Sequence, residues 1–255
     1  MNYTVISDKD NKERRNLAIN ELNKIGGGGT KIVFTDAVMA TRMPDEVVYS
    51  YTMPNTYLTK GQVGCALSHK QVYETFLDTK EPCITIFEDD IVFSDMCDIS
   101  LLEDIMNIVS EWEFPFVLVL QKSKYHIKEK AKVNAQVSIY SSYNQFCTHG
   151  YIINRAAAQN ILNIQTPIRF EIDMFKFYYW LGAAELFCLN QDLVLQSQDM
   201  PSTIEMSDKD GKLIDAEQRK AYGVLYKELT FKQKCKVFIK RMKKVLHTPF
   251  ETLDY

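Results

Sequence analysis

Three carboxylates stand side by side where an apolar stretch is interrupted. Glu88, Asp89 and Asp90 follow the apolar run 83–87 and precede a second apolar run, 91–93. Alternate side chains of an extended chain point the same way, so Glu88 and Asp90 could converge on one cation while Asp89 faces the other side. Oxygen ligands suit Mg²⁺ or Mn²⁺, which keep positions open for water and substrate phosphates. The cluster predicts either a metal-bridged phosphate site or a loop in which one carboxylate accepts backbone hydrogen bonds.

A second acidic pair and two histidines could also take part in chemistry. Glu171 and Asp173 lie in the segment FEIDMF, and either could serve as a general base. Asp173 could equally cap a helix expected over 174–181. His69 lies within an expected helix and His149 at an expected strand start, where a structural role remains open beside a catalytic or ligand-binding one.

Alternating strands and helices must position these residues. The apolar patterns predict strands over 3–6, 31–34, 83–88, 114–120, 137–140 and 147–154. Helical spacing predicts helices over 11–25, 61–77, 99–109, 155–164 and 231–246. This order predicts an α/β fold with a mixed, mainly parallel sheet flanked by helices. Ligands of such sheets bind beyond the carboxyl ends of the strands, where the acidic cluster falls.

Three connecting segments carry separate expectations. The long connection 35–60 suggests a binding loop. The basic and polar stretch 121–136 predicts a mobile connection, either a solvated face or a contact for phosphate or acceptor. The glycines of 26–29 lack the Lys-Ser/Thr of a phosphate-binding loop and are typical of a helix stop followed by a flexible turn.

Composition restricts the class of protein. The 255 residues carry a formal net charge of -3, which does not suggest a nucleic-acid binder. The six cysteines show no paired spacing, which favours reduced thiols in a cytosolic protein over disulfides or a zinc site. The sequence shows no secretory signal and no apolar run of the roughly 20 residues that span a bilayer.

Four blocks of the sequence resemble glycosyltransferase family 25, the lipooligosaccharide glycosyltransferases of Gram-negative bacteria and their collagen galactosyltransferase relatives. The blocks are VISDKDNKERR, YLTKGQVGCALSHKQVYE, ITIFEDDIVF and THGYIINRAAAQNIL, with a weaker fifth in PIRFEIDMF and DLVLQSQ. The resemblance implies a GT-A-type fold, a UDP-galactose or UDP-glucose donor, Mn²⁺ or Mg²⁺, and inversion at the anomeric carbon. One departure is Gln62, where the family commonly has Glu.

The resemblance also implies roles for the acidic residues. Asp90 is expected to bind the metal, Glu88 to share the ion or contact the ribose, and Asp89 to orient the donor sugar. Asp173, ahead of Glu171, is the expected general base.

The remaining site residues follow from the same resemblance. His149 is expected to contact the metal or the acceptor. Arg14 and Arg15 are expected at the diphosphate, although one of the two is expected to be a surface residue. The expected donor site is completed by further polar residues, the last two on the weaker fifth block alone: Ser7, Asp36, Ser68, His69, Gln196 and Gln198.

The C-terminal segment is set apart by its charge. We expect a GT-A-like catalytic domain over 1–228 and a basic amphipathic helix and tail over 229–255. Phe231, Cys235, Phe238, Met242 and Leu246 form one helical stripe among lysines. Such a helix could lie on an anionic membrane surface or dock on the core by its stripe.

The resemblance thus predicts a UDP-sugar-dependent hexosyltransferase, with a galactosyltransferase as the first expectation, that acts on a lipooligosaccharide or lipopolysaccharide core sugar. We expect it in the cytoplasm, peripheral on the inner face of the inner membrane. The alternative is a catalytically weak or inactive protein that binds a nucleotide sugar on the same fold. A metal-dependent phosphohydrolase is a third reading, without an obvious nucleophile.

Overall fold

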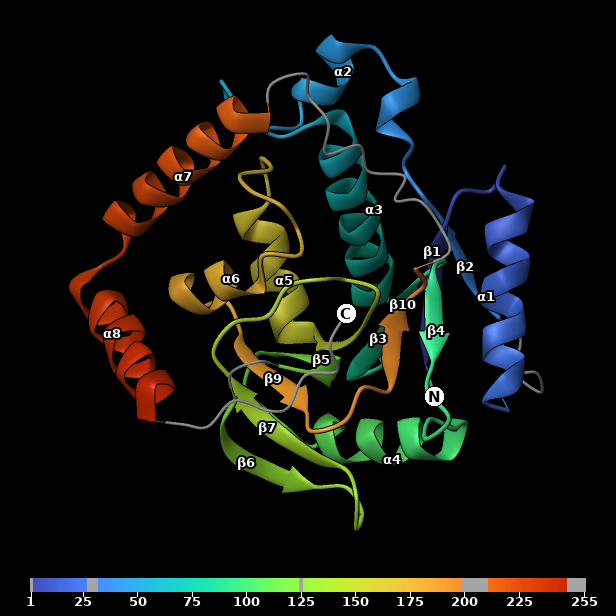
Figure 1. Ribbon diagram of the computed structural model, residues 1–255. Coiled ribbons are helices and arrows are strands. Elements are labelled where there is room, and N and C mark those ends of the chain that lie inside the picture. The colour runs from blue at the N-terminus through green and yellow to red at the C-terminus, as the bar shows by residue number, and fades with distance from the viewer. Residues whose placement is uncertain (1, 27–31, 124–125, 199–210, 247–255) are drawn as a thin grey trace.

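Eight strands form one sheet in the order β2-β1-β3-β8-β5-β9-β7-β6 (Figure 1). The structure is a computed structural model that describes residues 2–26, 32–123, 126–198 and 211–246. The strands are β1 (Tyr3–Ser7), β2 (Phe34–Asp36), β3 (Cys83–Glu88), β5 (Phe116–Lys122), β6 (His126–Lys132), β7 (Ser138–Ser142), β8 (Gly150–Asn154) and β9 (Glu185–Leu189). A separate antiparallel pair joins β4 (Ile91–Phe93) to β10 (Val194–Gln196).

The sheet is mixed, and its parallel pairs are grouped. Strand β1 runs parallel to both β2 and β3, and β5 runs parallel to β9. Strand β8 lies antiparallel between β3 and β5, and β7 lies antiparallel to β6 and β9. The predicted α/β class with a mixed sheet flanked by helices is confirmed. Three neighbouring parallel strands bring their carboxyl ends to one edge.

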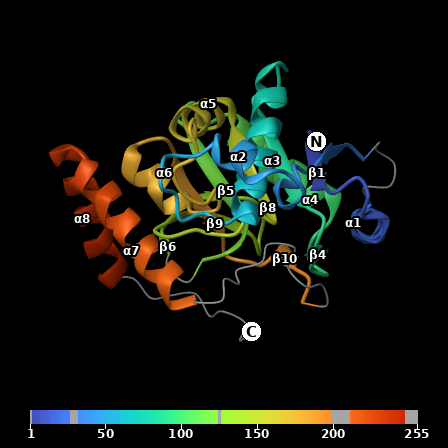
Figure 2. The same cartoon turned by 90° about the horizontal axis from the view of Figure 1, so that it is seen from above.

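Helices cover both faces of the sheet. The helices are α1 (Lys12–Lys24), α2 (Asp45–Tyr49), α3 (Lys60–Leu77), α4 (Ile99–Ser110), α5 (Arg155–Ile164), α6 (Phe175–Leu181), α7 (Gly211–Glu228) and α8 (Phe231–Leu246). Side chains of α3, α5 and α6 belong to one buried cluster, whereas those of α1 and α4 belong to the other. Both views place α7 and α8 at the opposite end of the molecule from α1 (Figure 1, Figure 2).

The central strands divide their side chains between the two clusters. In β3, Ile84 and Ile86 pack with α3 and α5, and Cys83 and Phe87 pack with α1 and α4. This alternation follows from the two-residue period of a strand. Because both faces are covered, β3 reads as a continuous apolar run up to its last residue, Glu88.

The prediction of a mobile connection over 121–136 is wrong. This stretch contains the end of β5 and the whole of β6, which pairs with β7 at the edge of the sheet. Its charged side chains include Lys128, Glu129 and Lys130, all exposed. Charges on an edge strand discourage pairing with another chain, which explains why the sequence pattern resembled a loop.

The connection 35–60 is more ordered than its sequence suggested. It contains the 3-10 turn η2 (Ala40–Arg42) and α2, and both contact α3. The strand expected over 31–34 is found at Phe34–Asp36 instead. The predicted flexible turn at 26–29 lies mostly outside the described residues.

Helix α8 is docked on the protein, but not by the predicted stripe. Val237 and Lys240 are buried, whereas Phe231, Phe238 and Met242 are 83%, 62% and 49% exposed. The stripe therefore faces solvent. The tail 247–255 lies outside the described residues, and the proposed division of the chain at 228 stays a prediction. Among the described residues, none of the helices has the length and apolar character needed to cross a bilayer.

Candidate active site

The site begins where three parallel strands end. Ser7, Asp36 and Glu88 are the last residues of β1, β2 and β3. The register places Ser7 opposite Asp36 and Ile6 opposite Glu88. A pocket at this edge is lined by polar side chains from these strands and from α1 and α3: Ser7, Asp8, Asn11, Arg14, Ser68, His69, Glu88, Asp89, Asp90 and Gln196. The structure thus brings together most of the donor-site residues expected from the sequence.

Arg14 binds two of the three clustered carboxylates. Its Nε donates to Asp89 Oδ1 at 2.6 Å, and its Nη2 lies 2.9 Å from Asp90 Oδ2. The Ser7 hydroxyl donates to the other Asp89 oxygen at 2.6 Å. Burial alone would lower the pKa of Arg14, but the two carboxylates outweigh it and raise that pKa. Asp89 is therefore held as a structural anchor, although it also lines the pocket expected to receive the donor.

Asp90 keeps one oxygen available. Gln196 Nε2 donates to Asp90 Oδ2 at 3.0 Å, on the same oxygen that faces Arg14. The other oxygen, Oδ1, is buried and has no hydrogen-bond partner among the described residues. Burial and the nearby charge of Glu88 raise the pKa of Asp90. An unsatisfied buried carboxylate oxygen is costly, and a bound cation would compensate it.

Glu88 lies at the end of a hydrogen-bonded chain. Its Oε1 faces Thr148 Oγ1 at 2.5 Å and His69 Nε2 at 3.2 Å. On the other side of the ring, His69 Nδ1 lies 2.8 Å from the Tyr151 hydroxyl. Burial would raise the pKa of Glu88, but the contacts with His69 and Thr148 outweigh it and hold that pKa below its usual value. Glu88 therefore remains ionised, and with Asp90 it fits the oxygen ligand set of Mg²⁺ or Mn²⁺.

His149 does not offer a free ring nitrogen to that set. Its Nε2 lies 3.0 Å from Gln121 Oε1, and the ring also hydrogen-bonds to the backbone of Val194. Burial lowers the pKa of His149, which favours the neutral ring. His149 thus fixes the start of β8 beside the site.

Three other side chains of types that bind metals also lie close together. One ligand atom each of Cys65, His69 and Glu88 lies within 4.8 Å of the others, in the part of the chain that the structure describes. A sulfur, nitrogen and oxygen set suits Zn²⁺ better than Mg²⁺. His69 and Glu88 already bond to each other, however, and burial raises the pKa of the Cys65 thiol well above its usual value. The contacts describe a hydrogen-bonded cluster in the wall between two pockets.

A second pocket adjoins the first. It is lined by Gln62, Cys65, Glu88, Cys147, Thr148, His149, Glu171, Ile172, Asp173, Met174, Gln196 and Gln218. Cys65, Glu88 and Gln196 also line the first pocket, so the two spaces share a wall. The two predicted base candidates, Glu171 and Asp173, both line this second pocket.

Glu171 is held by three neutral groups. Tyr57 Oη donates to its Oε2 at 2.7 Å, Tyr222 Oη to the same oxygen at 3.1 Å, and Gln218 Nε2 to Oε1 at 2.6 Å. Gln218 and Tyr222 belong to α7 and lie 47 and 51 residues beyond Glu171 in the sequence. With both oxygens occupied, Glu171 is placed to fasten α7 to the pocket.

Asp173 differs from Glu171 in its electrostatics. Burial, then the charges of Glu171 and Glu88, raise the pKa of Asp173 to about 6. The cap of α6 is Met174, without a side-chain cap hydrogen bond, so the predicted capping role of Asp173 is wrong. A carboxylate with a pKa near 6 is ionised at neutral pH and basic enough to accept a proton.

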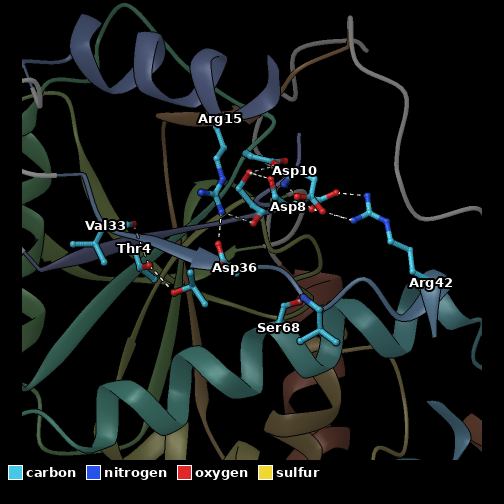
Figure 3. Close-up of polar contacts among 12 residues, drawn as sticks. Thr4, Asp8, Asp10, Arg15, Val33, Asp36, Arg42 and Ser68 are labelled. Carbon is cyan, nitrogen blue, oxygen red and sulfur yellow. Dashed lines mark hydrogen bonds and ion pairs between the residues drawn. The ribbon is translucent and has the colours of Figure 1, made fainter. Parts of the chain in front are cut away.

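Arg15 and Arg42 form three ion pairs at the outer rim of the first pocket. Figure 3 shows Arg15 directed to Asp36 and Arg42 directed to Asp8 and Asp10. Arg15 Nη2 also donates to the Ser7 carbonyl at 3.2 Å. Of the two arginines expected at the diphosphate, Arg15 thus lies at the rim, whereas Arg14 lies against the acidic cluster.

Ser68 and Gly64 hold the loop that forms another wall of this pocket. The Ser68 hydroxyl accepts from Val38 N at 2.8 Å and donates to the Gly64 carbonyl at 2.8 Å. A Cβ at Gly64 would lie only 2.5 Å from the Val38 carbonyl oxygen. Only glycine allows the loop to approach α3 this closely at position 64. The Ser68 hydroxyl then holds the loop in place through its bond to Val38.

Gln62 has a structural use that explains its type. Its side-chain oxygen accepts from Thr59 N at 2.9 Å, and Thr59 Oγ1 accepts from Gln62 N at 3.3 Å. This capping box at the start of α3 is served equally by Gln and Glu. Gln198 is exposed, and its weak assignment gains no support from its position.

Several site residues were missed by sequence reasoning. Thr148 stands in a quoted block, THGY, but a lone threonine carries no chemical signal. Tyr57, Gln218 and Tyr222 meet only through folding, and the two from α7 lie beyond the quoted blocks. Arg42 and Asp8 are separated by 34 residues.

Comparisons with known proteins agree with the sequence blocks. The model of glycosyltransferase family 25 (LPS biosynthesis protein) matches residues 1–176. A probable inactive glycosyltransferase 25 family member 3 of Bos taurus is 30% identical over 113 residues, which is 44% of this chain and 19% of that protein. Procollagen galactosyltransferase 2 of Mus musculus is 28% identical over 109 residues, 41% of this chain and 17% of that protein. The aligned part thus spans about a fifth of these curated relatives.

One solved structure with a similar course of the chain is S. aureus TarS 1-349 in complex with UDP-GlcNAc. It is 11% identical, with a TM-score of 0.45, and the match covers 97% of this chain and 74% of that one.

Proposed function

The chain belongs to glycosyltransferase family 25, and from that premise we propose that it is an inverting GT-A-type hexosyltransferase. The donor would be UDP-galactose or UDP-glucose, and the acceptor a core sugar of lipooligosaccharide or lipopolysaccharide. One observation carries the proposal: two pockets share Glu88 and Gln196, with the Asp89 and Asp90 cluster in one and Asp173 in the other. Such a pair can hold a donor and an acceptor on either side of one reacting bond.

In this proposal the UDP-sugar binds in the first pocket, at the ends of β1, β2 and β3, which we call the strand-end pocket. Arg14 keeps the carboxylates of Asp89 and Asp90 in place through its 2.6 and 2.9 Å contacts. Arg15 and Arg42 stand at the rim, where their exposed ion pairs could exchange for donor phosphate oxygens. Exposed pairs of this kind contribute at most about 1 kcal/mol, so exchanging them costs little.

Asp173 is the proposed general base. The acceptor hydroxyl oxygen attacks the anomeric carbon as the bond to the diphosphate breaks, and the leaving UDP takes that electron pair. The hydroxyl proton passes to the Asp173 carboxylate. Its pKa of about 6 leaves it ionised at neutral pH and ready to accept that proton.

The residues present fit a divalent cation. Asp90 would bind Mn²⁺ or Mg²⁺ through its unpartnered Oδ1, and Glu88 would be the second ligand. When bound, such an ion neutralises charge that develops on a departing diphosphate.

A second candidate is a nucleotide-sugar-binding protein without turnover. Relatives named as inactive members of the same family favour it. The change to Gln62 does not add to that case, because Gln62 completes the capping box of α3 as Glu would. The two candidates differ in turnover and not in donor binding.

The test is release of UDP from individual UDP-sugars with Mn²⁺, with and without lactose-like acceptors. The transferase proposal predicts release that depends on acceptor with one donor. Saturable UDP binding without release from any donor would support the binding protein instead.

We further propose that the enzyme works in the cytoplasm at the inner face of the inner membrane, through α8. The support is the exposed apolar stripe on that helix, with Phe238 and Met242 among basic residues. Phe238→Ser is expected to reduce sedimentation with anionic liposomes. Undiminished sedimentation would contradict this contact.

A further inference from the structure

A cavity between α8 and the sheet edge is lined by five lysines. They are Lys128 from β6 and Lys232, Lys236, Lys240 and Lys243 from α8, with Ser141, Tyr179, Glu185 and apolar side chains completing the wall. Glu185 is the acidic residue in this lining, and its Oε1 accepts from Lys236 Nζ at 2.6 Å. With all five lysines protonated, their charge would exceed that of the one carboxylate by four.

Lys240 is the buried member of the group. It is 4% exposed, and its Nζ has no hydrogen-bond partner in the part of the chain that the structure describes. The ammonium lies 3.5 Å from the centroid of the Tyr179 ring, and Lys236 Nζ lies 4.3 Å from the same centroid. The ring face attracts both cations. Lys236 also has the Glu185 carboxylate as an acceptor, whereas Lys240 has only the ring among the described residues.

The cost of this arrangement is visible in the charge balance. Burial, together with the charges of Lys236 and Lys243, lowers the pKa of Lys240 to about 7, although Glu185 and Cys188 act in the opposite direction. A buried ammonium donor without an acceptor is expensive for the fold. An anion with several acceptor oxygens would compensate both the missing acceptor and the excess of positive charge.

We propose that this lysine-lined cavity is a binding site for a phosphoryl anion, with Lys240 as its buried donor and Lys128 contributing from β6. A phosphoryl group offers several acceptor oxygens, enough for Lys240, Lys243 and Lys128 together. The site lies apart from the strand-end pocket and shares no lining residue with it. It does not depend on the transferase proposal.

Two sources could supply this chemistry. Ile239 lines the cavity and is also exposed beside Phe238, so a phospholipid headgroup could enter the cavity from a membrane that covers these side chains. A soluble phosphorylated molecule could fill the same cavity. The experiment has one arm for each source.

The first arm is a titration of the full chain, labelled with ¹³C at lysine Cε, with inorganic phosphate at constant ionic strength. The Lys240 resonance, identified by its loss in Lys240→Met, is expected to shift and saturate. Lys128→Met keeps Lys240 in place and should weaken phosphate binding about tenfold, as expected for one lost charged hydrogen bond. Lys234→Met, on the same helix but outside the cavity lining, should leave the affinity within about twofold.

Because Lys128 is exposed on an edge strand, its variant is expected to fold, so the test does not rest on Lys240→Met. No saturable shift of Lys240 relative to a chloride control would overturn the site. Equal weakening by Lys128→Met and Lys234→Met would overturn it as well, because it would indicate general screening of charge.

The second arm measures sedimentation with phosphatidylglycerol and phosphatidylcholine vesicles. Selective loss of phosphatidylglycerol binding in Lys128→Met, but not in Lys234→Met, supports a headgroup in the cavity. Saturable phosphate binding with equal vesicle binding of both variants supports the site and assigns it to a soluble phosphoryl compound. Neither readout uses turnover, so failure here is distinct from failure of the transferase proposal.

Discussion

Two pairs of carboxylates face the two adjoining pockets, and they are anchored by different chemistry. In the strand-end pocket, Asp89 is bound by the Arg14 guanidinium and the Ser7 hydroxyl. In the second pocket, Glu171 accepts hydrogen bonds from the neutral side chains of Tyr57, Gln218 and Tyr222. Each anchored carboxylate stands close in sequence to a second one, Asp90 or Asp173, that keeps capacity for a ligand or a proton.

The two anchors differ in whether they offset the negative charge of the carboxylate that they hold. Arg14 offsets part of the negative charge of Asp89 and Asp90, so they can stay together near a diphosphate. The neutral anchors of Glu171 leave its charge in place, and that charge helps to raise the pKa of Asp173 to about 6. A charged anchor therefore suits ion binding, and a neutral anchor suits a base.

The largest expected effect separates the two members of the second pair. Asp173→Asn should lower kcat about 1,000-fold, because the acceptor proton loses its base. UDP affinity, measured by calorimetry, should stay unchanged. Glu171→Gln keeps an acceptor oxygen for its partners and should lose far less activity. Equal losses of kcat in the two variants would contradict the assignment of Asp173 as the base and Glu171 as the anchored residue.

The same substitution has a signature in stability. The folded-state pKa of Asp173 is raised, so its contribution to stability is present at low pH and lost as the pH rises through about 6. Asp173→Asn should therefore be more stable than the wild type above pH 6, as measured by urea unfolding. Lower stability there would mean that the ionised carboxylate is needed by the fold.

The charged anchor of the first pair should dominate stability. Arg14→Met leaves Asp89 and Asp90 buried without their cation and should cost about 3 kcal/mol in free energy of unfolding. The matched control is Arg15→Met, the next residue on α1, whose partner Asp36 is exposed. That control should cost at most about 1 kcal/mol. Similar costs for the two arginines would remove the distinction between anchor and rim.

Metal-dependent turnover tests the free oxygen of Asp90. Asp90→Asn should lower Mn²⁺-dependent UDP release about 100-fold while the fold stays intact, because the replacement removes an anionic ligand. Asp95→Asn, an exposed position five residues later, is the control. Unaltered activity in Asp90→Asn would remove Asp90 from the site.

The smallest effect concerns the neutral anchors. Tyr222→Phe removes one hydroxyl donor to Glu171 and should cost about 1 kcal/mol in free energy of unfolding. Tyr226→Phe, one turn further along α7, has no described contact with Glu171 and should be close to neutral. If both variants are neutral, α7 is not fastened through Glu171.

Much of the fold could be predicted from the sequence. Helices α4, α5 and α8 have a clear apolar period, and β3 ends at Glu88, as its apolar run predicted. The edge strand β6 was missed because its exposed charges are typical of a loop. No prediction was made for α7, whose side chains Gln218 and Tyr222 complete the second pocket.

The site could be predicted only in part. The acidic cluster and Asp173 stand out as residue types in recognisable blocks. The pairing of Arg14 with Asp89 joins residues 75 positions apart, and nothing local specifies it. Whether Asp89 or Asp90 keeps a free oxygen depends on that pairing, so the roles within the cluster needed the three-dimensional structure.

The most direct test of the central claim is the pH dependence of acceptor-dependent UDP release in the wild type, measured from about pH 5 to pH 8. The account predicts a rate limited by ionisation of one group with a pKa of about 6, while UDP affinity stays level. The rising part of this pH profile should move to lower pH in Glu171→Gln, because the Glu171 charge that helps to raise the pKa of Asp173 is gone. Asp173 would not be the base if the wild-type rate did not change with pH, or if the pH at which the rate rises were the same in Glu171→Gln.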